Sequence, residues 1–276
     1  MGAIKKISQL LFWTCMLGFS ISCTDENEPG GNDVVVEAFL YAGEPVTDIR
    51  LKRIVKFNSG EETLYINDAD VTIGYLGQAF ALVPSPGDSG FYHYPGLDLE
   101  IIPGQTYTLE VNTVGTFITS ETVVPQSPTG LALSNNLIEV PKINSIFDLE
   151  VFGEIPEINV TWNNTEGVYH FLLTANTLEN PEPLNESGFD LAGRLSQILV
   201  SAPTLNDFDV IRPALLTTYG LHSVKLFRIN QEYVDLFSSF QQDSRNLNEP
   251  LTNIEGGVGI FTAFSSQEVF FEVRKP

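Results

Sequence analysis

Apolar and polar residues alternate with a period of two along most of the chain after Val34, which is the spacing of a half-buried β-strand. Residues 34–40 are apolar except at Glu37, which predicts a largely buried strand. The same alternation, bounded by glycine and proline turns, predicts further strands. They are expected at residues 49–57, 71–75, 106–111, 158–162, 169–173, 224–228, 258–264 and 269–273.

Three stretches of the chain lack this period. Asn230 precedes apolar residues at helical spacing and can cap a helix; they are Tyr233, Leu236, Phe237 and Phe240. The polar, turn-rich residues 180–209 predict a loop with one short helix near 191–199, and residues 241–253 predict a long polar loop.

The expected fold class is mainly β. Short strands separated by turns favour β-sandwiches, and the proline-rich stretch 125–130 has the composition of a linker. We therefore predict two tandem β-sandwich domains of the immunoglobulin or fibronectin III type, at residues 34–126 and 127–276. The second would carry short helical insertions. Its Trp162 strand, polar turn and Tyr169 strand resemble the fibronectin type III pattern.

The first 22 residues have the composition of a secretory signal peptide, with Lys5 and Lys6 followed by an apolar core at 10–21. That core is too short for a membrane span of ~20 residues. Ser22 and Cys23 fit the cleavage box of bacterial lipoproteins, although Ser20 stands where leucine is usual. We predict that Cys23 is acylated with palmitate-type chains that enter the lipid bilayer. The alternative is ordinary cleavage nearby, which leaves Cys23 as a free thiol.

Residues 23–33 form an acidic tether in this interpretation. Asp25, Glu26 and Glu28 resemble the signal that exports Bacteroidota lipoproteins to the outer face of the outer membrane. A plain solvated linker would have a similar composition. The expected location is the outer membrane with the body on the extracellular side, and a periplasmic orientation stays open.

The charge of the chain restricts its partners. The formal net charge is −21, and removing Lys5 and Lys6 with the signal peptide makes it about −23. Such a surface repels phosphate backbones, so nucleic acid is excluded as a partner, and it favours a monomeric body. The two cysteines are Cys15, in the signal peptide, and Cys23. The folded part therefore has neither a disulfide nor a thiol nucleophile.

No residue pattern identifies a catalytic, cofactor or metal site. Glycines at 256, 257 and 259 lack the lysine of a phosphate-binding loop, and a bulge or close backbone contact explains them better. His93, His170 and His222 lie far apart in the sequence, without zinc-ligand spacing. Two pairs of aspartates, Asp68 with Asp70 and Asp207 with Asp209, could share calcium, but solvated turns are the preferred interpretation.

Two other activities, ligand binding by an aromatic platform and hydrolysis, are alternatives. The aromatic run at 91–94 could form a glycan or peptide platform through Tyr92 and Tyr94, whereas simple strand alternation would separate its side chains. A hydrolase would need a serine, a histidine and a carboxylate that meet only in the fold. The chain has no Gly-x-Ser-x-Gly elbow. The prediction is therefore a protein that is not an enzyme.

Several segments in order resemble the Bacteroidota lipoprotein family catalogued as domain of unknown function 4249. The segments that carry the resemblance are 34–40, 50–53, 67–73, 90–92, 103–107, 120–125 and 253–261. The resemblance implies no catalytic residues. It implies an accessory or ligand-presenting component of a TonB-dependent uptake system, with an outer-membrane receptor as a partner. The alternatives are a free-standing adhesin or glycan-binding module and, less favoured, a hydrolase.

Overall fold

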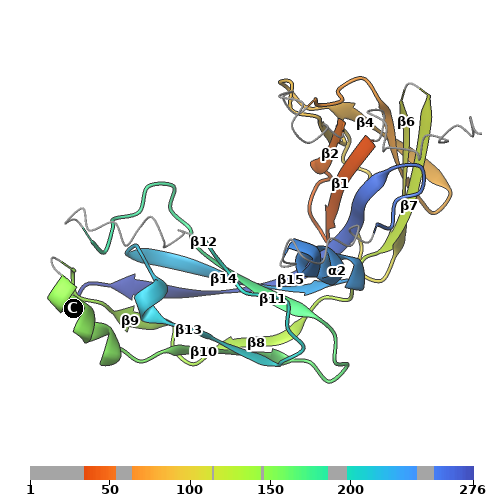
Figure 1. Cartoon of the computed structure of the whole chain (residues 1–276). Coiled ribbons are helices and arrows are strands. Elements are labelled where there is room, and N and C mark those ends of the chain that lie inside the picture. The colour runs from red at the N-terminus through yellow and green to blue at the C-terminus, as the bar shows by residue number, and fades with distance from the viewer. Residues whose placement is uncertain (1–33, 54–63, 114, 144–145, 186–197, 241–251) are drawn as a thin grey trace, which may run out of the picture.

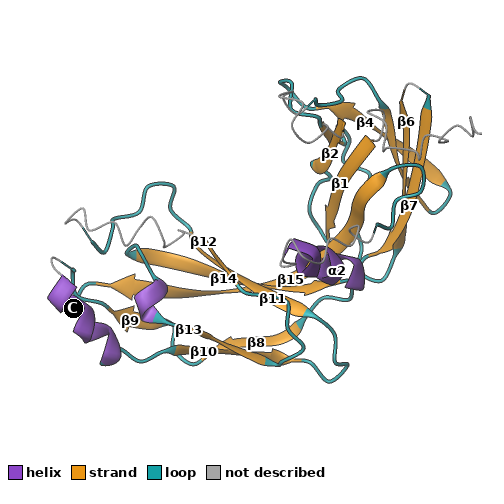
Figure 2. Cartoon of the chain, viewed as in Figure 1, coloured by secondary structure: helices purple, strands orange, loops and turns teal. Residues whose placement is uncertain are grey.

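The computed structural model describes residues 34–53, 64–113, 115–143, 146–185, 198–240 and 252–276, and these are mainly β (Figure 1, Figure 2). Among them, α2 (Gln231–Phe240) is the one α-helix, and η1 (Ile146–Gly153) and η2 (Pro213–Leu215) are 3-10 helices. The strands of the first half are β1 (Val34–Tyr41), β2 (Asp48–Arg53), β3 (Asp70–Tyr75), β4 (Gln78–Pro84), β5 (Phe91–His93), β6 (Thr106–Thr113) and β7 (Thr116–Val123). Those of the second half are β8 (Thr129–Leu133), β9 (Leu137–Glu139), β10 (Ile158–Asn163), β11 (His170–Asn176), β12 (Ile198–Val200), β13 (Phe208–Ile211), β14 (Gly220–Ile229) and β15 (Val258–Arg274). The prediction of a mainly β chain is confirmed.

Hydrogen bonds connect most strands into one continuous twelve-stranded sheet. Its order is β12-β11-β14-β15-β1-β2-β5-β4-β3-β6-β7, and β9 also pairs with β15. A second sheet has the order β13-β10-β8. The two halves of the molecule meet at an angle, with α2 at the bend and β15 passing through it (Figure 1).

The first half has its own apolar core. β1 alternates as predicted, and the side chains of Val34, Val36, Ala38 and Leu40 are buried in it. Strands β3 and β6 add their inward-facing residues to the same core. The sheet curves back on itself, because Thr119 of β7 pairs with Glu255 just before β15, with N–H to carbonyl distances of 3.0 and 2.8 Å.

The second half packs its two sheets face to face. Ile158, Val160 and Trp162 share the buried face of β10, as their alternation predicts. They pack in one cluster with Leu226 and Phe271 of the large sheet. In Figure 1 the strands β8, β10 and β13 lie along one side of β11, β14 and β15. Apolar packing between two layers therefore supplies this core.

β15 corrects the prediction of two separate closing strands. It is continuous over 17 residues, pairing with β1 up to Phe264 and with β14 from Phe264 onward. The polar residues 265–267 suggested a break in the sequence. Instead they continue the ladder with β14, and the Ser265 hydroxyl is buried and donates to the Pro125 carbonyl oxygen. A buried hydroxyl is tolerated inside a strand when it has such a partner.

The predicted boundary at residues 126 and 127 stays a prediction. One buried cluster contains residues from 34–124, and β15 adds Phe261 and Ala263 to it. A second cluster contains residues from 131–273, including Phe271 and Val273 of the same strand. Pro125 and Pro128 in the linker-like stretch are buried. β15 thus belongs to both halves, which ties them together.

Three local predictions have partial outcomes. The helix after residue 230 is confirmed as α2, but the Asn230 amide donates to the Val123 carbonyl oxygen at 2.8 Å, on β7. Residues 191–197 of the other predicted helix lie outside the described residues, and Ile198–Val200 is a strand, which corrects its end. Residues 54–57 of the second predicted strand and 241–251 of the predicted loop also lie outside them.

Candidate functional site

A cluster of aromatic side chains holds the two halves together at the bend. We call it the elbow cluster, and its members are Phe39, Tyr41, Phe171, Phe227, Tyr233 and Phe264. Tyr41 of β1 stacks on Phe264 of β15 with ring centroids 5.2 Å apart, and Tyr233 of α2 meets the Phe264 ring edge-on at 5.0 Å. Phe264 therefore contacts strands of both halves and the helix. Offset and edge-to-face pairs of this kind favour one relative orientation.

Polar contacts also lie at the bend, and one ion pair crosses it. The Lys225 Nζ of β14 lies 2.8 Å from a carboxylate oxygen of Glu44, in the turn after β1. The Tyr41 hydroxyl donates to Asp48 Oδ2 at 3.2 Å. Burial, with the Asp48 carboxylate beside it, raises the pKa of Tyr41, so this hydroxyl keeps its proton. Packing and hydrogen bonds together make the bend a rigid platform.

An exposed apolar surface extends from the elbow cluster along the large sheet. We call it the apolar strip, and it consists of Leu173, Ala175, Ile198, Val200 and Phe270. Directly paired residues point to the same face of a sheet. Leu173 pairs with Val200 and Lys225, Ala175 with Ile198 and Ser223, and Ser223 with Phe270, so polar residues of β14 lie between Phe270 and the other members of the strip. Phe171 and Phe227 share this face, so the strip begins at the bend.

The apolar strip is a candidate protein-binding surface. The side chains of Val200 and Phe270 are 57% and 46% exposed, although each lies in or beside an ordered sheet. Exposed apolar residues that gather on one face of a protein mark interaction sites. Strand β12 at one end of the strip is also the edge of the sheet. The sequence contained a signal for this surface. Residues 171–173 are apolar at consecutive positions, so apolar side chains lie on both faces of one strand.

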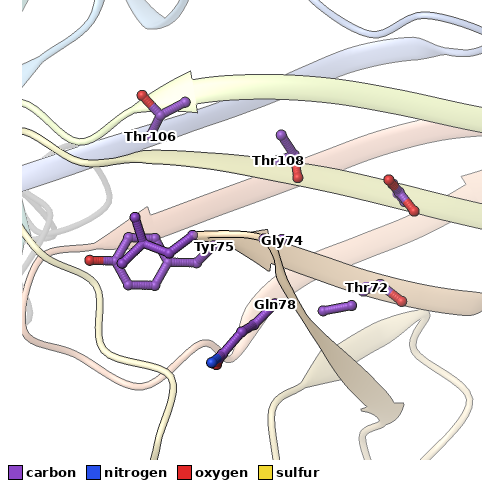
Figure 3. A pocket seen from close by; sticks show the side chains of 10 residues that line it. Thr72, Gly74, Tyr75, Gln78, Thr106 and Thr108 are labelled. Atoms are coloured by element: carbon purple, nitrogen blue, oxygen red, sulfur yellow. The ribbon is translucent and has the colours of Figure 1, made fainter.

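A hollow of about 390 Å³ lies on the first half, beside the β3–β4 turn (Figure 3). The residues that line it are mostly small or hydroxylic: Thr72, Gly74, Tyr75, Gln78, Thr106, Thr108 and Glu110 among them. A Cβ on Gly74 would overlap the Thr108 hydroxyl, so a larger residue here would require that side chain to rotate. Tyr75 stacks on the buried Tyr107 at 4.7 Å, which fixes its ring. Such a lining suits a neutral polar ligand better than it suits acid–base catalysis.

The three histidines do not come together. His93 Nδ1 lies 3.0 Å from the Ser85 hydroxyl on the first half. His170 and His222 are buried on the second half, and each Nδ1 lies within hydrogen-bond distance of a backbone carbonyl, of Val168 and Gly220 respectively. His170 and His222 are therefore buried residues of strands, in agreement with the interpretation made from the sequence.

Burial lowers the pKa of both His170 and His222, so we expect stability to depend on pH. In the unfolded chain the two rings gain protons as the pH falls through about 6.5, whereas in the folded protein they resist protonation. The free energy of unfolding should therefore fall as the pH drops from 7.5 to 5.5. Urea unfolding across this range measures it, and His222→Gln should flatten the dependence. An unchanged slope in that variant would contradict this assignment, and His93→Gln is the control.

Only one member of each predicted acidic pair lies in a turn: Asp68 and Asp207 precede strands, whereas Asp70 begins β3 and Asp209 lies within β13, which corrects the prediction. Asp68 and Asp70 are exposed on either side of Ala69, and Asp207 is exposed. The Asp209 carboxylate accepts a hydrogen bond from the Val210 N–H at 2.7 Å. Over the ranges described, no three histidine, cysteine, aspartate or glutamate side chains gather as metal ligands would.

The aromatic run at 91–94 follows simple alternation. Tyr92 is fully buried, and its hydroxyl donates to the Ile66 carbonyl oxygen and accepts from the Ala69 N–H. Tyr94 packs edge-on against Phe80 and donates to Asp98 Oδ1 at 2.6 Å. Tyr92 therefore cannot form part of an exposed ligand platform.

Glycines 256, 257 and 259 allow close backbone contact, as the structural interpretation predicted. Gly259 has a φ of +121°, and a Cβ on it would overlap the Val36 carbonyl oxygen of β1. A Cβ on Gly256 would overlap the Phe117 carbonyl oxygen of β7. The chain thus enters β15 between β1 and β7, where only glycine fits. Cys23 and the tether lie outside the described residues, so their prediction is untested.

The fold and these surfaces define a mainly β protein with an exposed apolar face beside a rigid bend. The chain belongs to the family described as domain of unknown function (DUF4249), whose model matches residues 22–269. No curated protein matches the chain. No helix in the described part of the chain is both long and apolar enough to cross a membrane.

Two solved structures are reported as similar at low levels. A chain of a cytokine receptor complex is 8% identical, with a TM-score of 0.24, over 86% of this chain and 95% of that one. Domains A168 to A170 of titin are also 8% identical, with a TM-score of 0.21, over 87% of this chain and 66% of that one. TM-scores this low carry no argument about fold or function.

Proposed function

We propose that the protein is a non-enzymatic, surface-exposed outer-membrane lipoprotein of Bacteroidota. Acylated Cys23 would anchor a monomeric body, which would act as an accessory or ligand-presenting component of a TonB-dependent uptake system. The lipoprotein box, the acidic tether and the family resemblance support the anchor and the location. The apolar strip supports the role, because it provides a surface for a protein partner.

We propose in addition that each half is a β-sandwich of the immunoglobulin or fibronectin III type, with helical insertions in the second. Face-to-face packing of the β13-β10-β8 sheet on β11, β14 and β15 through Trp162 supports this for the second half. In the first half, the curved sheet that encloses a single core supports it. The helical elements η1, η2 and α2 all occur after residue 127.

The observation that carries the proposed role is the exposure of Val200 and Phe270 beside a rigid bend. A free monomer gains nothing by leaving these side chains in water, since burying apolar surface is favourable at about 25 cal/mol per Å². A partner that covers the strip would therefore gain affinity from it. The elbow cluster reduces the entropy lost on binding, because the surface is already ordered.

Site-specific photo-crosslinking in intact cells tests this role. A benzophenone amino acid at Phe270 should crosslink to a TonB-dependent outer-membrane receptor. The matched control is the same amino acid at Phe208, which is 55% exposed on the other sheet and should give no such product. Equal labelling of the receptor from both positions, or labelling from neither, would contradict a role for the apolar strip. Protease shaving of the same cells reports whether the body faces the outside.

The anchor is tested separately by mass spectrometry of the mature N-terminus and by the Cys23→Ala variant. We expect an acylated cysteine in the natural chain and loss of the variant from the membrane fraction, because acyl chains supply the membrane affinity. An unacylated N-terminus, or a variant that still sediments with the envelope, would refute the lipoprotein assignment.

The hollow beside Gly74 favours a second candidate function, a glycan-binding module. Hydroxyl and amide groups around a fixed tyrosine ring suit a sugar, which offers hydroxyls and flat apolar faces. A glycan array with the full chain tests it. Binding that is lost in Tyr75→Ala and kept in Tyr94→Ala would support this function, and an array without any bound glycan would refute it.

A further inference from the structure

The polypeptide enters the fold at the end of the first half that lies farthest from the bend. β1 begins at Val34 and ends at Tyr41, which belongs to the elbow cluster. β15 runs parallel to β1, from Val258 at the same far end to Phe264 at the bend. Any lipid on Cys23 is therefore connected to this far end, and the second half extends from the opposite one (Figure 1).

Three exposed apolar side chains surround the entry point. We call them the entry rim: Leu64, Phe117 and Val258. The Arg53 N–H donates to the Leu64 carbonyl oxygen at 2.8 Å, and Arg53 pairs with Val34. Val258 pairs with Val35 on the other side of β1.

The third member, Phe117, reaches the entry point through the glycine segment. Gly256 packs against its carbonyl oxygen, and Gly257 packs against the Val34 carbonyl oxygen. Phe117 is 61% exposed although its strand is ordered and its neighbour Ile118 is fully buried. The three side chains of the rim thus lie around one end of the sheet, and each is held in place by backbone hydrogen bonds or pairing.

We propose that the entry rim rests on the lipid surface, with Phe117 in the interfacial region of the bilayer. This orientation depends on the proposed acylation of Cys23. The ten residues 24–33 can span at most about 35 Å when extended. The tether therefore limits the distance between the entry point and the bilayer to about 35 Å. Exposed apolar side chains that are held near a membrane partition into its interface.

The charges at this end of the first half do not favour binding to anionic lipid, so the proposed contact with the bilayer is mainly apolar. Within the described part of residues 34–124, the basic residues all lie on β2, and Arg53 is the one nearest the entry. Asp70 is exposed at the same end, since it pairs with Asn112, which pairs with Phe117. Electrostatic attraction to anionic head groups therefore cannot replace the apolar contact if that contact is lost.

This orientation also explains why the apolar strip can stay accessible on an anchored protein. The strip lies on the second half, beyond the bend, whereas the rim lies at the far end of the first half. With the rim on the lipid, the rigid elbow cluster directs the strip away from the bilayer. If the second half instead lay on the membrane with the face of the strip downward, lipid would cover the strip.

Quenching of tryptophan fluorescence by brominated phospholipids tests the proposal. The full-length acylated protein is reconstituted in vesicles of phosphatidylethanolamine and phosphatidylglycerol with brominated acyl chains. Phe117→Trp should lose at least about half of the added emission, because bromine quenches only at short range. The matched control Phe208→Trp, similarly exposed but on the second half, should keep its emission. The buried Trp162 contributes the same background to both variants.

The outcomes separate this proposal from the lipid anchor on which it depends. Flotation of both variants with the vesicles, without quenching at position 117, would overturn the orientation and leave the anchor intact. Failure of both to float would refute the anchor and the orientation together. Leu64→Trp provides a second site on the rim and should be quenched like Phe117→Trp. Equal quenching at position 208 would place the second half on the membrane as well and overturn the proposal.

Discussion

Phe264→Ala is expected to lower the free energy of unfolding by about 4 kcal/mol, the cost typical of removing a buried phenylalanine ring. Phe264 is almost fully buried and contacts aromatic rings on β1, β11, β14 and α2. No neighbouring segment can move in to fill the cavity without breaking the pairing of β15 with β1 and β14. Equilibrium unfolding in guanidinium chloride measures the loss.

The same variant should also weaken the coupling between the two halves. The Phe264 ring joins Tyr41 of the first half to Phe227 of the second, so we expect its loss to separate one unfolding transition into two. Phe270→Ala is the control on the same strand, and its half-exposed ring should cost about 1 kcal/mol or less. Similar losses in the two variants would show that the elbow cluster has no special role in stability.

Gly259→Ala is expected to lower the free energy of unfolding by about 3 to 5 kcal/mol, through backbone strain and steric overlap together. Gly259 has a φ of +121°, a conformation that residues with a Cβ rarely adopt. Its Cβ would also overlap the Val36 carbonyl oxygen, which is fixed within the β1 ladder. Circular dichroism during thermal and chemical unfolding measures the effect.

Gly115→Ala separates the two contributions to this cost. Gly115 also has a positive φ, of +79°, but a Cβ there would have no heavy atom within 4 Å. We therefore expect only the cost of strain, about 1 kcal/mol. A loss in Gly259→Ala no larger than this would mean that β1 and β15 can separate locally, and that the close packing in the structure is not required.

Much of the architecture could be predicted from local pattern. β1, β3, β6 and β10 bury the residues that their alternation assigned to one face, because the period of a strand is a property of its own backbone. Helix α2 begins where the spacing of apolar residues changes. Glycines 256, 257 and 259, around the start of β15, also predicted close backbone contact, because the absence of a Cβ is a property of the residue itself.

The parts that could not be predicted depend on distant partners. Residues 265–267 are polar and indicated a break, but Ser265 pairs with Arg228 and bonds to Pro125, which is 140 residues away in the sequence. The apolar strip was missed because it depends on which residues of β11, β12 and β15 pair with one another and with β14. The hypothesis that Tyr92 is exposed as part of a ligand platform was wrong. Its hydroxyl bonds to the backbone of residues 66 and 69, and the local sequence around residue 92 does not show these partners.

The sequence by itself determined the mainly β class, the inward face of most strands and the strong negative charge, since each depends on composition or on residues that are close together in the chain. Only the tertiary structure decided that β15 passes through both halves, that aromatic rings from five segments fix the bend, and that the chain enters at the far end of the first half. These features arise from contacts between distant segments, as in the pairing of Val35 with Val258, which are 223 residues apart (258 − 35). No local pattern encodes such contacts, because the free energy that selects them comes from the apolar surface buried by the whole fold.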